Sequence, residues 1–186
     1  MKKKLIGCIG LARSGKDTTA DYLCKEHGFI KYSFANPLKK GCMEMFGFTY
    51  DQVFGDAKDE IHPVWNCTPR DILKIMGTEV CQYDLQKYVP SFNEIGRLIW
   101  VKRFEQWYAQ VSPTDNDFKV VIPDVRFVHE AESIVKMGGE IWRVDRPGMD
   151  VGDLHASEKE MFNIQYIKLL TNDKDLNYLY SQIDGK

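Results

Sequence analysis

The sequence contains no apolar run that approaches the length of a membrane span, so we expect no membrane-spanning segment. Its first residues, Met1-Lys-Lys-Lys, lead into a short strand-like run without the pattern of a cleavable signal peptide. The five cysteines are odd in number and include no Cys-x-x-Cys pair (Cys8, Cys24, Cys42, Cys67 and Cys81). Such a set is typical of reduced thiols rather than of disulfides or zinc ligands. We therefore expect a cytoplasmic protein.

The sequence also lacks an excess of charge of either sign, because its net charge is −2 with 28% charged residues. There is no overall basic field to attract nucleic acid, and we expect a small-molecule partner instead. Internal repeats, low-complexity tracts and domain linkers are absent, and 186 residues are enough for one sizeable core. We therefore expect a single domain.

Residues 5–20, LIGCIGLARSGKDTTA, form an apolar run followed by a glycine-bounded loop and the start of a helix. Gly10-x-x-x-x-Gly15-Lys16 matches the phosphate-binding loop pattern in the strand, loop and helix context that the pattern requires. The glycines allow torsions that turn successive N–H groups inward, and the helix N-terminus favours an anion. The loop therefore predicts a polyphosphate site, with Lys16 reaching the outer phosphates. A structural glycine turn is the alternative.

The loop departs from this pattern at Asp17, where a Ser or Thr hydroxyl usually helps to hold Mg²⁺. A carboxylate beside a polyphosphate is repelled unless a cation intervenes. Asp17 therefore suggests a metal contact, direct or through water, or a partner arginine, and Thr18 follows it. The alternative is an ordinary acidic residue in a first helical turn, where the helix dipole favours it.

The predicted elements run strand, helix, strand, an inserted helical section, and then strand, helix, strand, helix, strand, helix. Strand, helix, strand units of this length imply parallel crossovers. We therefore predict an α/β fold, a three-layer sandwich with a parallel five-stranded sheet. The core would comprise residues 1–35 and 118–186, the inserted section residues 36–117, and a lid-like loop residues 147–158. Apart from the first, the strands are expected at 29–35, 118–124, 140–146 and 167–172, and helices at 16–27, 36–46, 93–111 and 173–183.

The run 118–124, FKVVIPD, is apolar and ends in an acid, which is typical of a central parallel strand. Ligands bind at the carboxyl edge of an open α/β sheet, so Asp124 should lie near Lys16 and can orient Mg²⁺ or its waters. Arg126 follows on the same edge. Glu130 lies four residues further on, within helical reach of the Arg126 guanidinium, and is expected to hold it.

The inserted section begins irregularly. Residues 47–67 contain glycine, proline and several acids, and we expect a mobile insertion over one side of the site. A helix restarts at Thr68-Pro69-Arg70, with a capping threonine and a proline at the first helical position. Gly77-Thr78 should interrupt this helix, since glycine costs about 1 kcal/mol relative to alanine there. Close approach of a ligand and a simple kink are both open explanations.

The arginines bear on the phosphoryl acceptor. An alcohol acceptor is helped by a carboxylate base. A phosphate acceptor instead needs positive charge between two anions, because each unit pair at 4 Å costs about 4 kcal/mol at an effective dielectric of 20. Five arginines are candidates for that role (Arg13, Arg70, Arg126, Arg143 and Arg146). Their number favours a phosphate acceptor.

The sequence resembles the deoxynucleoside monophosphate kinases of tailed bacteriophages from residue 10 to about residue 158. The resemblance is carried by the helix around Trp100 and by five segments in the family's order and spacing: SGKDTTADYL, FANPLKKG, TPRDILKIMGTEV, VIPDVRFVHEAE and GGEIWRVDRPG. It implies a P-loop NTPase fold of the nucleoside monophosphate kinase type. It also implies transfer of the γ-phosphate of ATP to a dNMP, with Mg²⁺, for DNA precursor synthesis.

By position, the resemblance and the reasoning above imply four groups of site residues. ATP would be bound by Gly10, Arg13, Ser14, Gly15, Lys16, Thr18, Asn172 and Asp173, and the metal by Asp17, Thr18 and Asp124. The dNMP would be bound by Arg70, Lys74, Gly77, Thr78 and Trp100. The catalytic group would comprise Lys16, Asp17, Asp124, Arg126 and Glu130.

The chain departs from the family pattern at two places and in length. Lys74 stands where a glutamine is common, and Cys81-Gln82 stand where an arginine is common. The first change bears on base selection and the second on one phosphate contact. The insertion between residues 35 and 68 is also reduced.

Two other functions remain as alternatives. The phosphomevalonate kinase of animals shares the GKD loop and the DVR turn, but the aromatic Trp100 suits a base better than a short aliphatic chain. A nucleotide-dependent switch would need a water-positioning group and a sensor loop, and we find neither. The accepted bases, the exclusion of ribonucleotides, the formation of a homodimer and the role of residues 155–158 stay open.

Overall fold

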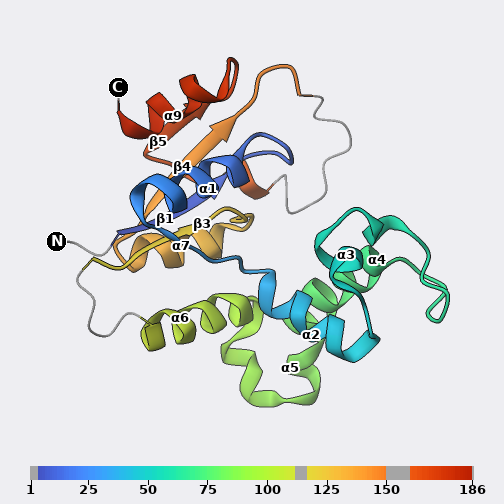
Figure 1. Cartoon of the computed structure of the whole chain (residues 1–186). Helices are drawn as coiled ribbons and strands as arrows, with labels where there is room; N and C mark the ends of the chain where they lie inside the picture. Colours follow the sequence, from blue (N-terminus) through green and yellow to red (C-terminus); the bar gives the residue numbers. More distant parts are fainter. Residues whose placement is uncertain (1–3, 112–116, 150–159, 186) are drawn as a thin grey trace. The chain divides into compact units, whose positions relative to one another are not determined.

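The computed structural model describes residues 4–111, 117–149 and 160–185. The chain divides into two compact units, of which unit 1 comprises Met1–Phe34 with Ala109–Lys186 and unit 2 comprises Ala35–Tyr108. Unit 1 holds a sheet with helices, and unit 2 is helical (Figure 1). Among the described residues, no helix is long and apolar enough to cross a membrane. The lid-like loop predicted at 147–158 lies outside the described residues from position 150 onward.

The sheet of unit 1 has five strands in the order β2-β3-β1-β4-β5, and every paired neighbour is parallel. The strands are β1 (Lys4–Ile9), β2 (Ile30–Lys31), β3 (Lys119–Ile122), β4 (Glu140–Asp145) and β5 (Lys168–Thr171). Strand β1 lies between β3 and β4 and is buried from its second residue to its last, which explains its unbroken apolar sequence. The predicted α/β fold with a parallel five-stranded sheet is confirmed.

Helices cover both faces of this sheet. Ile6 of β1 belongs to a buried cluster with Leu23 of α1 (Lys16–His27) and Leu179 of α9 (Leu176–Asp184). Gly7, the next residue of β1, faces the other way, because a Cβ added to it would lie 2.7 Å from Cδ1 of Ile134. Ile134 belongs to α7 (Val128–Lys136), so α7 covers the opposite face and the three layers follow.

Strand β2 is much shorter than the predicted strand at 29–35. Its last ladder contact runs from Tyr32 N to Val121 O at 2.9 Å. Beyond it, the N–H of Phe34 donates to the Asp124 side chain instead of to a neighbouring strand. The strand therefore ends early because a side chain replaces the backbone acceptor.

Unit 2 consists of short helices around a small core. They are α2 (Asn36–Phe46), α3 (Tyr50–Phe54), α4 (Pro69–Lys74), α5 (Leu85–Tyr88) and α6 (Ile99–Val111), with the tighter or wider turns η1 (Ala57–Asp59), η2 (Ile75–Asp84), η3 (Pro90–Glu94) and η4 (Gly96–Leu98). The core consists of Cys42, Phe48 and Val53, with partly buried apolar residues packed against them. Helix α6 begins six residues later than the predicted helix at 93–111, since 3₁₀ turns occupy most of residues 90–98.

The predicted irregular segment 47–67 contains a defined helix. Thr49 caps α3 through a reciprocal capping box, in which Thr49 Oγ1 accepts from Gln52 N at 3.3 Å and Gln52 Oε1 accepts from Thr49 N at 2.9 Å. Thr49-x-x-Gln52 is a capping-box pattern that predicts a helix start, although the glycines and acids around it favour an irregular segment. The expectation of an irregular segment was therefore wrong for residues 49–59.

The helix that begins at Pro69 does not stop at Gly77. It continues as the π-helix η2, which is a form often found at functional sites. Gly77 is buried, and a Cβ added to it would lie 2.6 Å from Cδ2 of Leu38 in α2. Close packing of two helices thus explains this glycine. The predicted interruption of the helix at Gly77 was wrong, and the hydrogen-bond register changes at Ile75, where η2 begins.

Candidate active site

The loop after β1 has the backbone of a phosphate-binding loop. Gly10 (φ 147), Arg13 (φ 63) and Gly15 (φ 113) all lie in the left-handed region. A Cβ on Gly10 would collide with the carbonyl oxygen of Val144 in β4, so only glycine allows the loop to lie against that strand. Helix α1 begins directly afterwards at Lys16 without a side-chain cap among the described residues. Its first N–H groups therefore point toward an open site for an anion.

Two side chains of this loop face the site. Ser14 is 1% exposed, and its Oγ has no hydrogen-bond partner among the described residues. Lys16 Nζ donates to the carbonyl oxygen of Leu11 at 2.6 Å, so the ammonium lies over the loop itself. A buried hydroxyl without a partner is costly, and a bound phosphate oxygen would supply the missing hydrogen bond.

The loop is supported from β5 and from the residues before it. Asn172 Nδ2 donates to Ser14 O at 2.9 Å, and Asn172 N donates to Asp145 O at 2.7 Å. Gly10 N donates to the thioether sulfur of Met161 at 3.0 Å. The Asn172 side chain, predicted near adenine, is therefore used to hold the loop backbone, while the neighbouring Asp173 is exposed. Sequence reasoning missed Met161, since nothing local marks it.

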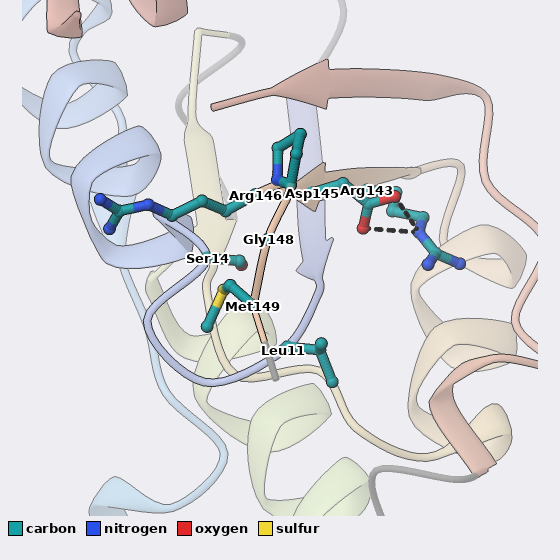
Figure 2. Close-up of a pocket in the computed structure, with 8 residues that line it drawn as sticks. Leu11, Ser14, Arg143, Asp145, Arg146, Gly148 and Met149 are labelled. Atoms are coloured by element: carbon teal, nitrogen blue, oxygen red, sulfur yellow. Dashed lines mark hydrogen bonds and ion pairs between the residues drawn. The ribbon is translucent and has the colours of Figure 1, made fainter. Parts of the chain in front are cut away.

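A cavity of about 270 Å³ opens beside the loop at the end of β4 (Figure 2). It is lined by Leu11, Ser14, Arg143, Asp145, Arg146, Pro147, Gly148 and Met149. Figure 2 shows the side chains of Arg143 and Arg146 leaving β4 in opposite directions. Arg143 is held in place, because its Nε donates to both oxygens of Asp145 at 2.9 and 3.0 Å. Arg146 is exposed beside the loop.

Asp17 and Thr18 lie in the first turn of α1. The Asp17 carboxylate is exposed and pairs with Lys31 Nζ at 2.8 Å, and Lys31 also contacts Asp21 at 3.0 Å. Thr18 is half-buried. The partner of Asp17 is thus a lysine of β2 where the sequence suggested an arginine or a metal ion, and a metal contact by Asp17 would compete with this ion pair.

Asp124 follows β3 at the carboxyl edge of the sheet, as its position in the sequence predicts. Its Oδ2 accepts from Ser33 Oγ at 2.6 Å, and its Oδ1 accepts from Phe34 N at 3.1 Å. Both donors come from the segment after β2. Sequence reasoning did not single out Ser33, because a lone serine at a strand end carries no signal of its own.

The turn after Asp124 carries Arg126 and is fixed by Glu130. Glu130 is 4% exposed, and its Oε2 accepts from the backbone N–H of Arg126 at 2.8 Å and of Phe127 at 3.1 Å. The predicted contact of Glu130 with the Arg126 guanidinium was wrong, because Glu130 binds the backbone N–H of Arg126 instead. Burial raises the pKa of Glu130 to about 8, although these two N–H bonds favour its ionised form.

Unit 2 carries the other predicted site residues. Arg70, in the first turn of α4, binds both carboxylate oxygens of Asp59, through Nε and through Nη2, the latter at 2.9 Å. This hydrogen bond lowers the pKa of Asp59. Lys74 is exposed at the end of α4 and Thr78 is half-buried in η2. Arg70 thus already forms the two-pronged contact with an anion that a phosphate would require.

Trp100 and Gly77 are in direct contact. The indole Nε1 of Trp100 and the amide Nε2 of Gln82 both donate to the carbonyl oxygen of Gly77 at 3.0 Å. Gln82 is 4% exposed, and its Oε1 has no hydrogen-bond partner among the described residues. Trp100 is half-buried, so part of its side chain is accessible to solvent while its N–H is held by a hydrogen bond. Of the predicted dNMP residues, Gly77 of η2 and Trp100 of α6 are therefore joined by a hydrogen bond.

The predicted site residues lie in both units. Unit 1 brings Asn172 to the phosphate loop, Ser33 to Asp124, and Glu130 to the turn that carries Arg126. Unit 2 brings together Gly77 and Trp100. Within the described residues, no three His, Cys, Asp or Glu side chains gather as a metal site.

The chain is similar to known proteins over nearly its whole length. The family model for deoxynucleotide monophosphate kinases matches residues 4–61 and 66–183. A protein of Acanthamoeba polyphaga mimivirus described as a deoxynucleotide monophosphate kinase is 38% identical over 183 residues, which cover 96% of this chain and 93% of that protein. The crystal structure of TT1252 from Thermus thermophilus covers 100% of this chain and 96% of its own, at a TM-score of 0.50 and 12% identity, and shows the fold alone.

The deoxynucleotide monophosphate kinase of Enterobacteria phage T4 is a more distant relative. It is 25% identical over 235 aligned positions that cover 97% of each chain. Since 235 positions exceed the 186 residues of this chain, the phage protein carries segments that this chain lacks. The reduced length noted in the sequence agrees with this. Together, the family model and the mimivirus relative confirm the predicted family, and the chain belongs to the deoxynucleotide monophosphate kinase family.

Proposed function

We propose that this chain transfers the γ-phosphoryl group of ATP to a deoxynucleoside monophosphate and so forms the diphosphate for DNA precursor synthesis. The observation that carries the proposal is the loop at residues 10–16, which presents helix N–H groups, an unpartnered buried serine hydroxyl and a lysine to one anion site. Family membership makes the chain an ATP-dependent phosphotransferase. The reaction would take place in the cytoplasm, that of the host if the chain is viral.

On the donor side, the phosphate loop would hold the phosphates of ATP. Lys16 would exchange the carbonyl oxygen of Leu11 for the outer phosphates, and Ser14 Oγ would gain its missing partner. Asp124, alone or through water, would hold Mg²⁺, which would supply neutralisation of the phosphate charge. Asp124 suits that ion better than Asp17 does, because Asp17 is paired with Lys31 on the surface.

On the acceptor side, Arg70 would bind the monophosphate. Its guanidinium holds Asp59 through two N–H groups, which is the geometry in which arginine binds phosphate. The substrate phosphate would therefore replace Asp59. Trp100 would contact the base or sugar with its ring, while Lys74 and Thr78 would complete the pocket.

Charge neutralisation is the main chemical task in this proposal. Two phosphates in near contact repel each other by about 4 kcal/mol for each pair of unit charges at 4 Å and an effective dielectric of 20. Arg126 would reduce this repulsion, and the turn that carries it is fixed by Glu130. The acceptor is already an anion, so no strong base is needed. The family match also disfavours the phosphomevalonate kinase and switch alternatives.

The test is acceptor-dependent formation of ADP. The protein is incubated with ATP, Mg²⁺ and each dNMP, each NMP or mevalonate phosphate in turn, with Lys16→Ala as the inactive control. We expect turnover with one or more dNMPs and little with mevalonate phosphate. ADP release that is the same with and without every acceptor would contradict the proposal and favour a nucleotide switch.

A further inference from the structure

The carboxylate of Asp124 is fixed at both oxygens by two neighbouring residues. Ser33 Oγ donates to Oδ2 at 2.6 Å, and Phe34 N donates to Oδ1 at 3.1 Å. Both distances are those of good hydrogen bonds, and the hydroxyl to carboxylate bond has the short length of a charge-assisted one. A carboxylate held at both ends has one orientation. The two donors therefore determine where the Asp124 oxygens point.

The donors lie at a special place in the chain. Phe34 is the last residue of the first segment of unit 1, and unit 2 begins at Ala35. The last ladder bond of this segment, from Tyr32 N to Val121 O, comes two residues earlier. Phe34 is 3% exposed, so its ring anchors the same backbone in the core. The Asp124 contact is thus a connection between the sheet edge and the residue at which the chain leaves unit 1.

We propose that Ser33 is a positioning residue for phosphoryl transfer, whose hydroxyl holds the Asp124 carboxylate in the orientation that the reaction needs. Ser33 lies two residues before unit 2, which would bind the acceptor. The inference rests on the proposed function, because that function gives Asp124 its role. Ser33 would act through Asp124. If Ser33 were only a stabilising hydrogen bond at a strand end, its loss would lower the melting temperature and leave turnover by the folded protein unchanged.

The first test is a comparison of Ser33→Ala, Ser33→Thr and Ser181→Ala in the acceptor assay. Ser33→Ala should lower kcat about tenfold while the KM values for ATP and dNMP stay within about twofold, since the orientation of a fixed carboxylate matters mainly in the transition state. Ser33→Thr keeps the hydroxyl and should restore kcat to within about twofold. Ser181 is a matched control, because it is a half-buried serine of unit 1 whose Oγ donates within its own helix, to Tyr178 O at 2.8 Å.

The second test uses the protein without any nucleotide. Amide hydrogen exchange at Phe34 should be faster in Ser33→Ala than in the wild type, because a less firmly held carboxylate is a poorer acceptor for this N–H. Exchange should be unchanged in Ser181→Ala. A wild-type kcat in Ser33→Ala would overturn the inference, whether or not exchange changes, and so would a loss of kcat that Ser33→Thr does not restore. If the wild type phosphorylates no dNMP, the proposed function fails, while the exchange result still decides whether Ser33 holds Asp124.

Discussion

Glu130 should make the stability of this protein depend on pH. Burial raises its pKa from 4.5 to about 8. The folded protein therefore binds the Glu130 proton more tightly than the unfolded chain does, and the free energy of unfolding should decrease as pH rises from about 4.5 to about 8. At about 1.36 kcal/mol per pKa unit, the full decrease is at most about 5 kcal/mol. The carboxyl group thus stabilises the fold most when it is protonated.

Glu130→Gln isolates this contribution. Glutamine keeps a carbonyl oxygen for the N–H groups of Arg126 and Phe127, but it cannot ionise. Urea denaturation of both proteins at about pH 5, about pH 7 and about pH 9 gives the difference in unfolding free energy at each pH. This difference should shift in favour of the variant as pH rises, by up to about 5 kcal/mol. Other titrating groups act equally in both proteins and cancel.

Glu132→Gln serves as the matched control. Glu132 lies two residues further along α7 and is exposed, so its removal should leave the pH dependence of the wild type in place. The reasoning would be refuted if Glu130→Gln and the wild type differed by the same free energy at every pH. In that case burial would not raise the pKa of Glu130, and the two N–H bonds would dominate.

Three further predictions concern unit 2. Gly77→Ala should lower the free energy of unfolding in urea by about 1–3 kcal/mol, because its Cβ would lie 2.6 Å from Leu38 Cδ2; an unchanged value would mean that Leu38 moves aside freely. Asp59→Asn should lower the KM for dNMP, because it removes the carboxylate that occupies Arg70; a higher KM would show instead that Asp59 orients Arg70. Trp100→Phe should raise the KM for dNMP less than Trp100→Ala does, and equal increases would mean that the indole N–H, not the ring, matters.

The elements that the sequence predicted best are those whose ends are marked locally. Helix α1 covers the predicted residues 16–27, since it lies between Gly15 and Gly28, and Gly28 adopts the left-handed conformation of a helix end. Helix α2 covers the predicted residues 36–46, with proline in its first turn and a left-handed glycine after it. Where such signals were weak or mixed, as at residues 29–35 and 47–67, the predicted boundaries differ from the structure.

The site shows the same division between local and distant information. The phosphate loop and the acid at the end of β3 follow from motif and topology. By contrast, the partners of the charged residues are contributed by other elements: Lys31 for Asp17, and Asp59 for Arg70. Since the sequence contains many acidic and basic residues that could form such pairs, it does not show which of them pair with Asp17 and Arg70.

The sequence by itself determined the family, the nucleotide-binding loop and the order of strands and helices, because each of these depends on residue types at short, fixed spacings. Only the tertiary structure decided that Ser33 and Phe34 hold Asp124 and that Gly77 makes room for Leu38. These contacts depend on distances between segments that are far apart along the chain. Such distances exist only after the sheet and the helices have packed.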